Sequence, residues 1–281
     1  MEKRILLPTD FSKNALNAIR YALELYRNQQ CVFYFLNVYQ VDSYTIDSMM
    51  VPEPGEERYE MAKRASEEGM DKLMDILKLH NDDPKHTYHT ISTFNTLLYG
   101  ISTTIAKKDI DLVVMGTKGA TGAKAVLLGT NTVDVMQHIT ESPVLAIPEE
   151  YRFSPPKEIV FPTDYKSSFK RRELNDLIEI SKLHHTAIRV LHIEEDVKLN
   201  KEQENNKEVL EGILEGQNYS NHRLTDVKTY TGIHTFIQSR ESDMIAFVNK
   251  KHGFLKSILS KSLVKEIGYD ANIPILVLND H

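Results

Sequence analysis

Segments with two different periods alternate along the first half of the chain. Short apolar or strand-forming runs are separated by longer segments whose apolar residues recur at three- and four-residue spacing. The predicted strands are 4–7, 31–38, 86–91, 111–115 and 143–147. The predicted helices are 13–28, 57–79, 95–108 and 130–140. Alternating strands and helices of this kind predict an α/β fold with a parallel sheet covered on both faces.

The second half of the chain repeats this pattern. Residues 4–11, RILLPTDF, recur as residues 158–165, EIVFPTDY, and the stretch around Pro143 recurs around Pro274. Two copies of this length indicate a duplicated domain and not a solenoid. We expect two tandem five-stranded, Rossmann-like domains, joined by a short proline-bearing linker. The expected domains are 1–150 and 151–281.

A glycine-bearing loop follows the predicted strand at 111–115. It reads GTKGATGAKAVLLGT, with Gly116, Gly119, Gly129 and Thr130 in the order Gly-x2-Gly-x9-Gly-Thr. Glycines let backbone N–H groups approach phosphate oxygens because no Cβ stands in the way. The helix that begins near Thr130 adds unpaired N–H donors and the positive end of its dipole. The order strand, loop, helix therefore predicts an anion site.

Two familiar phosphate-binding motifs do not fit this loop. A Walker-type loop ends in Gly-Lys-Ser/Thr, whereas this one ends in Gly129-Thr130 without the lysine. A dinucleotide fingerprint requires Gly-x-Gly-x-x-Gly in the first strand–helix unit, where this chain has none. Ligands of open α/β sheets bind beyond the carboxyl ends of the strands. We therefore expect Asp10, Val38 and Gly116, which follow or end predicted strands, to gather at that edge.

Asp10 allows two interpretations. It can cap the first helix, as Ser12 also can, or it can face a ligand. Its recurrence as Asp164 does not decide between them, because a structural cap would also survive duplication.

Composition narrows the class of protein. The chain has 281 residues, 41% of them hydrophobic, and a formal net charge of −6, so it has no basic surplus for nucleic acid. Cys31 is the only cysteine and is expected to be a small core residue. The apolar run at the N-terminus is too short for a signal peptide, and no run reaches the ~18–20 residues that span a membrane. We expect a cytoplasmic protein that binds neither nucleic acid nor membrane.

Catalytic and metal-binding motifs are sparse. Among eleven histidines there is no His-Glu-x-x-His, and His86 and His89 point to opposite faces of one strand. There is no Gly-x-Ser-x-Gly elbow, and no base stands beside a nucleophile. The sequence predicts no metal site and no catalytic residue. Slow ATP hydrolysis stays open, because Asp10 could hold a metal through water.

Three features together resemble the universal stress protein family. They are Pro-Thr-Asp after the first strand, Leu-Asn-Val ending at Val38, and the glycine spacing, which matches that of family members that bind ATP. The resemblance covers essentially the whole chain as two tandem copies. It implies a five-stranded parallel sheet with helices on both faces in each copy. It also implies pairing through the last strands, here 143–147 and 274–278 within one chain, and whole chains that form a homodimer.

The resemblance also implies how a nucleotide would bind. Asp10 corresponds to the family's aspartate at the adenine and ribose end of the site, and the backbone of Val38 corresponds to the valine backbone that contacts adenine. The residues implied to contact the nucleotide are Thr9, Asp10, Val38, Met115, Gly116, Lys118, Gly119, Gly122, Gly129, Thr130, Asn131 and Thr132. Asn37 departs from the family pattern, where a histidine is frequent. The implied ligand is ATP, or ADP or AMP, with or without Mg²⁺.

The second copy departs further from the pattern. Its loop, residues 249–262, keeps only Gly253, which does not align cleanly, and side chains at the lost glycine positions would crowd a triphosphate. We expect a degenerate site there, with its lysines solvated.

Three functions are compatible with these features. The leading one is an adenine-nucleotide-binding regulatory protein of the stress response, acting on a protein partner that the sequence does not identify. The second is a slow ATPase that depends on Asp10 and metal. The third is a scaffold without nucleotide that uses the long segment 41–57 as an interaction surface.

Overall fold

The computed structural model describes residues 2–40, 54–80, 83–117, 129–194, 199–250 and 273–279. In the first half, strands and helices alternate as the sequence predicts. The elements are β1 (Lys3–Pro8), α1 (Lys13–Leu25), β2 (Cys31–Tyr39), α2 (Glu57–His80), β3 (His86–Phe94), α3 (Leu97–Lys108), β4 (Leu112–Gly116), α4 (Thr130–His138) and β5 (Val144–Ile147). Each predicted strand and helix of this half is present, with ends that differ by a few residues.

The second half repeats the order of elements. They are β6 (Glu158–Pro162), a 3-10 turn (Arg171–Leu174), α5 (Asn175–His184), β7 (Ala187–Glu194), α6 (Lys201–Leu214), β8 (Tyr219–Thr225), α7 (Thr229–Arg240), β9 (Met244–Asn249) and β10 (Ile275–Asn279). The predicted domain boundary near residue 151 falls in the segment between β5 and β6, which has no helix or strand. The boundary itself stays a prediction.

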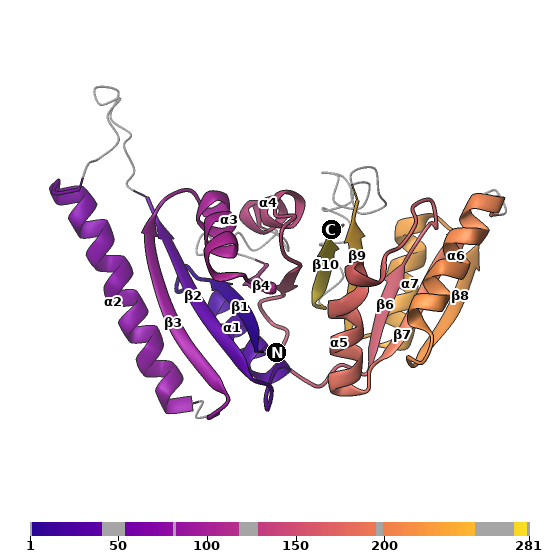
Figure 1. Cartoon of the computed structure of the whole chain (residues 1–281), viewed down its shortest axis with the longest axis horizontal. Helices are drawn as coiled ribbons and strands as arrows, with labels where there is room; N and C mark the ends of the chain where they lie inside the picture. Colours follow the sequence, from indigo (N-terminus) through magenta and orange to yellow (C-terminus); the bar gives the residue numbers. More distant parts are fainter. Residues whose placement is uncertain are drawn as a thin grey trace, which may run out of the picture.

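All ten strands form one sheet in the order β3-β2-β1-β4-β5-β10-β9-β6-β7-β8 (Figure 1). Neighbours within each half are parallel, as predicted, and each half has the same order of equivalent strands. The halves meet at β5 and β10, which pair antiparallel with Leu145 opposite Leu276. In each half the strand order reverses beside the first strand, which is where open α/β sheets bind ligands.

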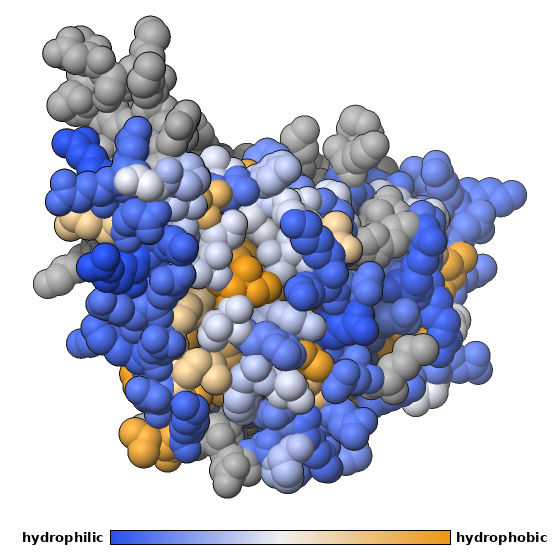
Figure 2. Space-filling view, turned by 60° about the vertical axis from the view of Figure 1, so that its left-hand side comes forward, coloured by the Kyte–Doolittle hydropathy of each residue, from blue (hydrophilic) through white to orange (hydrophobic). Residues whose placement is uncertain are grey.

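The helices cover both faces of this sheet and bury two apolar layers. One layer contains Ile19 of α1, Leu73 of α2 and Leu177 of α5. The other contains Ile101 of α3, Val135 of α4 and other side chains from α7. Near-continuous apolar strands are expected where both faces of a sheet are covered. On the face turned forward in Figure 2, hydrophilic side chains predominate around a small hydrophobic patch.

Side chains also join the two halves beside the sheet. Lys3 Nζ of β1 lies 2.8 Å from Asp176 Oδ1 of α5, and Lys3 also contacts Glu179. In the connecting segment, the ring of Phe153 packs edge-on against buried Tyr21 of α1, with 5.2 Å between ring centroids. Tyr151 Oη donates a hydrogen bond to the carbonyl of Asp243. The connection is therefore packed against both halves.

No helix among the described residues combines the length and the apolar character needed to cross a membrane.

A buried carboxylate holds β6 to its neighbours. The Glu158 side chain is 11% exposed, and its two oxygens accept hydrogen bonds from Arg189, Arg240 and Ser242 at 2.7–2.9 Å. Burial by itself raises the pKa of this carboxyl, yet the bonds from Arg240, Arg189 and Ser242 lower it to about 2. Because the ionised form is favoured by folding, Glu158 stabilises the native state above its ordinary pKa.

We predict that Glu158→Gln lowers the free energy of unfolding at neutral pH by about 3 kcal/mol, the magnitude that matches such a pKa shift. The difference from the unmodified protein should persist above pH 4.5 and shrink as the pH falls toward about 2. Denaturant unfolding at several pH values measures it. The control is Glu24→Gln, which should cost little because the Glu24 side chain is 37% exposed and pairs with Arg27 at the surface. Equal losses in the two variants would contradict this role of Glu158.

Candidate functional site

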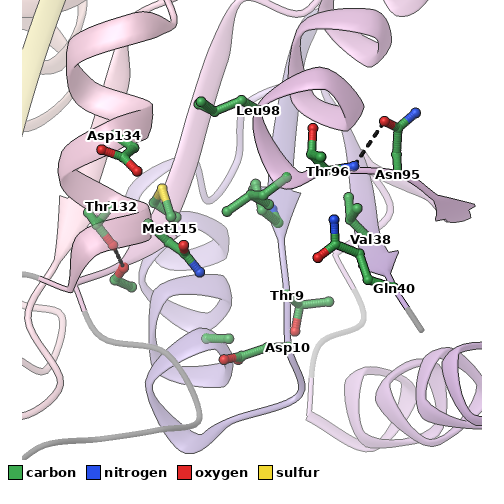
Figure 3. A pocket seen from close by; sticks show the side chains of 15 residues that line it. Thr9, Asp10, Val38, Gln40, Asn95, Thr96, Leu98, Met115, Thr132 and Asp134 are labelled. Atoms are coloured by element: carbon green, nitrogen blue, oxygen red, sulfur yellow. Dashed lines mark hydrogen bonds between the residues drawn. The ribbon is translucent and has the colours of Figure 1, made fainter. Parts of the chain in front are cut away.

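A cavity of about 730 Å³ opens where the carboxyl ends of β1, β2 and β4 meet the first turns of α3 and α4 (Figure 3). This volume is typical of pockets that hold a small ligand. Its lining residues are Pro8, Thr9, Asp10, Ala15, Val38, Gln40, Asn95, Thr96, Leu97, Leu98, Met115, Gly116, Asn131, Thr132 and Asp134. Asp10, Val38 and Gly116 thus gather at one edge, as the order of strands predicts.

The turn after β1 shows that Asp10 is not the cap of α1. Ser12 is the N-cap of α1, and its hydroxyl accepts the N–H of Ala15 at 3.2 Å. Asp10 instead accepts the N–H of Ser12 through Oδ1 at 3.0 Å and remains exposed beside the cavity. Asp10 therefore shapes the turn before the helix, while Ser12 caps it.

The second half builds the same turn. Thr9 Oγ1 accepts the N–H of Phe11, and Thr163 Oγ1 accepts the N–H of Tyr165, both at 3.0 Å. The two aromatic residues have positive φ angles of 62° and 55°, which are unusual for bulky side chains. Asp164 also accepts the N–H two residues later. The recurrence of Pro-Thr-Asp is thus explained by a turn, and it does not by itself indicate a ligand.

Gly116 ends β4 in a place with no room for a side chain. A Cβ added there would lie 2.6 Å from Cγ of Asn14, a residue of α1 that is 3% exposed. The carbonyl of Gly116 accepts a hydrogen bond of 2.9 Å from the hydroxyl of Thr132, which fixes α4 to β4. The hydroxyl of Thr132 therefore has a structural partner, although the resemblance placed it facing phosphate.

The N-terminus of α4 faces the cavity. Its N-cap is Gly129, which offers no side-chain cap, and the N–H of Gly129 donates to the carbonyl of Thr117. The first amides of a helix, here those of Thr130 and Asn131, lack acceptors within the helix and carry the positive end of its dipole. Because Asn131 and Thr132 line the cavity, this helix end offers an anion site.

The opposite end of the cavity is formed by β2 and the turn into α3. Val38, Gln40, Asn95 and Thr96 lie close together at this end, and Leu98 lies further along α3 (Figure 3). Asn95 Oδ1 accepts the N–H of Thr96 at 2.9 Å, which leaves the donor groups of its amide for other partners. Amide side chains beside apolar ones suit a heterocyclic base, which offers donors and acceptors at its rim and flat faces above and below.

Four polar residues of this lining, Gln40, Asn95, Thr96 and Asp134, were not predicted from the sequence. Gln40 and Asn95 follow the ends of β2 and β3, and their place after strands is the only local signal they carry. Asp134 lies one turn inside α4, where nothing local marks it. Three predicted contacts, Lys118, Gly119 and Gly122, lie outside the described residues.

The described lining is acidic. It contains the carboxylates of Asp10 and Asp134 and neither lysine nor arginine. Among the described residues, no group of three or more His, Cys, Asp or Glu side chains could hold a metal ion by itself. Cys31 is fully buried in β2, and burial raises the pKa of its thiol to about 12, so the reactive thiolate is disfavoured.

Comparisons with known proteins agree with this architecture. A model of the universal stress protein family matches residues 1–148, and the chain belongs to that family. A universal stress protein of Methanocaldococcus jannaschii is 28% identical over 151 residues, which are 52% of this chain and 81% of the relative.

Two solved structures resemble the fold over nearly the full length. A universal stress protein from Archaeoglobus fulgidus covers 98% of this chain and 96% of its own, with a TM-score of 0.67 at 16% identity. A Pseudomonas aeruginosa protein of unknown function covers 99% of this chain and 92% of its own, with a TM-score of 0.59 at 11% identity. At these identities the likeness concerns the fold alone.

We predict that Gly116→Ala destabilises the protein by about 1–3 kcal/mol, because the new methyl group would overpack against Asn14. Gly212→Ala is the matched control, since nothing lies within 4 Å of the added Cβ and Gly212 is inside α6. Because alanine has a higher helix propensity than glycine, the Gly212→Ala variant should be more stable by up to about 1 kcal/mol. Chemical denaturation of both variants measures the contrast, and a loss in the control alone would reverse our interpretation.

Proposed function

We propose that this protein is an adenine-nucleotide-binding regulator of the stress response, with one nucleotide in its first half. The observation that carries the proposal is the 730 Å³ cavity between strand ends, with the N-terminus of α4 at one end and amide and apolar side chains at the other. The glycine spacing that begins at Gly116 continues this anion site in sequence. ATP, ADP and AMP share the chemistry that such a cavity recognises.

In the proposed pose the phosphates lie at Asn131 and Thr132, near the first amides of α4. The base lies between Val38 and Leu98, where the apolar lining is concentrated. Asp10 lies between the two ends, so ribose hydroxyls or a phosphate-bound cation would lie near it.

The equivalent place in the second half supports a single site per chain. Ile5 pairs with Leu112 and Ile159 pairs with Met244, so Val248 takes the place of Gly116. A valine there adds the side chain that the first half leaves out. Lys250 follows Val248 by two residues, and its Nζ lies 3.1 Å from the buried carboxylate of Glu173. A buried carboxylate at this strand end disfavours phosphate.

Calorimetric titration of the nucleotide-stripped protein with ATP and Mg²⁺ should give about one site per chain. Gly119→Val should abolish binding, because a side chain in the glycine loop blocks the approach of phosphate to the backbone. Gly253→Val, in the loop of the second half, is the matched control and should leave the affinity unchanged. Two sites per chain, or full affinity in Gly119→Val, would sink the assignment.

Binding should also depend strongly on Mg²⁺. The carboxylates of Asp10 and Asp134 repel a bare triphosphate, and a divalent cation neutralises both sides. We expect chelation with EDTA to weaken ATP binding by about tenfold or more. Asp134→Asn should recover part of the affinity without metal, and Asp75→Asn, on the outer face of α2, should not. Affinity that is insensitive to metal in all three proteins would contradict this prediction.

The same fold limits which surface whole chains could use to form a homodimer. Since β5 and β10 pair within one chain, a homodimer of whole chains would use another surface. The homodimer, the cytoplasmic location and the protein partner stay predictions.

A further inference from the structure

A second cavity, of about 320 Å³, lies in the second half between α6 and the strands β7 and β8. It is on the α6 side of the sheet. Its lining residues are Tyr165, His192, Glu194, Leu199, Glu204, Lys207, Asn221, His222 and Arg223. Most of this lining is polar, which is uncommon for a space beneath a helix unless the polar groups have partners.

The first half fills the corresponding space. Strand register makes Asn37 the equivalent of His192, because Pro8 pairs with Leu36 and Pro162 pairs with Leu191. There Ser66 of α2 is 2% exposed, and its hydroxyl bonds to Asn37 and Ser92 at 2.6 Å. The two halves therefore differ in side chains at a shared position of one fold.

The ring of Phe11 closes the same space from the other side in the first half. It lies so close to α2 that a Cβ added at Gly69 would be 2.4 Å from it. The matching turns make Tyr165 the equivalent of Phe11. Tyr165 therefore carries a hydroxyl where the first half has only a ring edge.

Two deeply buried side chains of the second cavity have polar atoms available to a ligand. His192 is 7% exposed, and its Nδ1 lies 2.9 Å from the carbonyl of Thr163. A carbonyl only accepts, so Nδ1 carries the hydrogen, and in this tautomer of the imidazole Nε2 is an acceptor. Tyr165 is 2% exposed. Among the described residues, neither His192 Nε2 nor Tyr165 Oη has a hydrogen-bond partner.

The walls of this cavity are held in place by backbone-directed bonds. Gln203 Nε2 donates to the carbonyl of Asp164, and Asn206 Nδ2 donates to the carbonyl of Tyr165, both at 2.8 Å. These bonds tie α6 to the Pro-Thr-Asp turn. A rigid wall lowers the entropic cost of binding a small molecule.

The charges of the described part of the lining balance. Glu194, whose side chain is 10% exposed, forms an ion pair with Arg223. Lys207 and Glu204 lie on α6, on the opposite wall. A net anion would meet the two carboxylates, and a net cation would meet the two basic groups. A molecule that carries one charge of each sign avoids both penalties.

We propose that this cavity binds a small zwitterion of the α-amino-acid type. Its ammonium group would donate to His192 Nε2 and to the carboxylate of Glu204. Its carboxylate would face Lys207 and Arg223 and accept a hydrogen bond from Tyr165 Oη. The volume admits a free amino acid and is far smaller than that of the nucleotide cavity. The proposal does not depend on nucleotide binding.

The test is calorimetric titration of the whole chain with each protein α-amino acid in turn, and with mannitol as a neutral polyol. The chain itself supplies the variants. His192→Asn copies Asn37, whose Nδ2 already makes the equivalent bond to the carbonyl of Thr9 at 2.7 Å. Tyr165→Phe copies Phe11 and removes only the hydroxyl. Both should fold, and melting curves check this directly.

At least one amino acid should bind, and each variant should weaken it by about tenfold, the usual effect of one lost hydrogen bond. His185→Asn is the matched control, because His185 is exposed, lies outside the cavity and has a left-handed backbone that asparagine tolerates. It should leave the affinity unchanged. ATP affinity should stay constant in all three variants, which separates this site from the nucleotide cavity.

Three outcomes would overturn the proposal. They are no binding of any amino acid, equal affinity in His192→Asn and Tyr165→Phe, and binding of mannitol in competition with the amino acids. The last would assign the cavity to polyols.

Discussion

The antiparallel pairing of β5 with β10 is the contact on which the rest of this molecule depends. A parallel five-stranded sheet ends in a strand whose outer N–H and C=O groups are unpaired, and such an edge invites association. The chain pairs the β5 edge of its first half with the β10 edge of its second half, so the backbone groups of both strands find partners. The pairing also brings β1 and α5 close enough for Lys3 to reach Asp176 across the joint. The backbone pairing of β5 with β10 thus organises the interface between the halves, and side chains reinforce it.

Duplication followed by divergence explains why the two halves share a fold and differ in chemistry. Arg4 and Glu158 occupy the same position of the first strand with opposite charges. Arg4 pairs with Asp109 at the surface, where an ion pair contributes little. Glu158 is buried among several donors, so the same position contributes to stability in the second half. Burial, and not the presence of an ion pair, makes the difference.

The same comparison shows which shared residues have a structural role and where the two halves differ. The Pro-Thr-Asp turn is present in both halves with the same hydrogen bonds, so geometry accounts for its recurrence. Gly116 and Val248 occupy the same position in the two halves. A side chain at Gly116 would clash with Asn14 of α1, so glycine lets β4 lie this close to α1. Beneath α2 the first half is packed, while beneath α6 the second half keeps a polar cavity. Each half has therefore kept open a different part of the shared fold.

The order of strands and helices could be predicted from the sequence because hydrophobic period is a local property, and so could the edge at which Asp10, Val38 and Gly116 meet. The pairing of the two last strands came from family resemblance and not from pattern. Tertiary structure alone decided which residues complete the cavity at the ends of β1, β2 and β4. Gln40, Asn95 and Asp134 come from three elements that are distant in sequence, and only folding brings them together. It also decided that Ser12 caps α1 while Asp10 shapes the turn, because both side chains offer the oxygen that a cap requires and only their geometry distinguishes them.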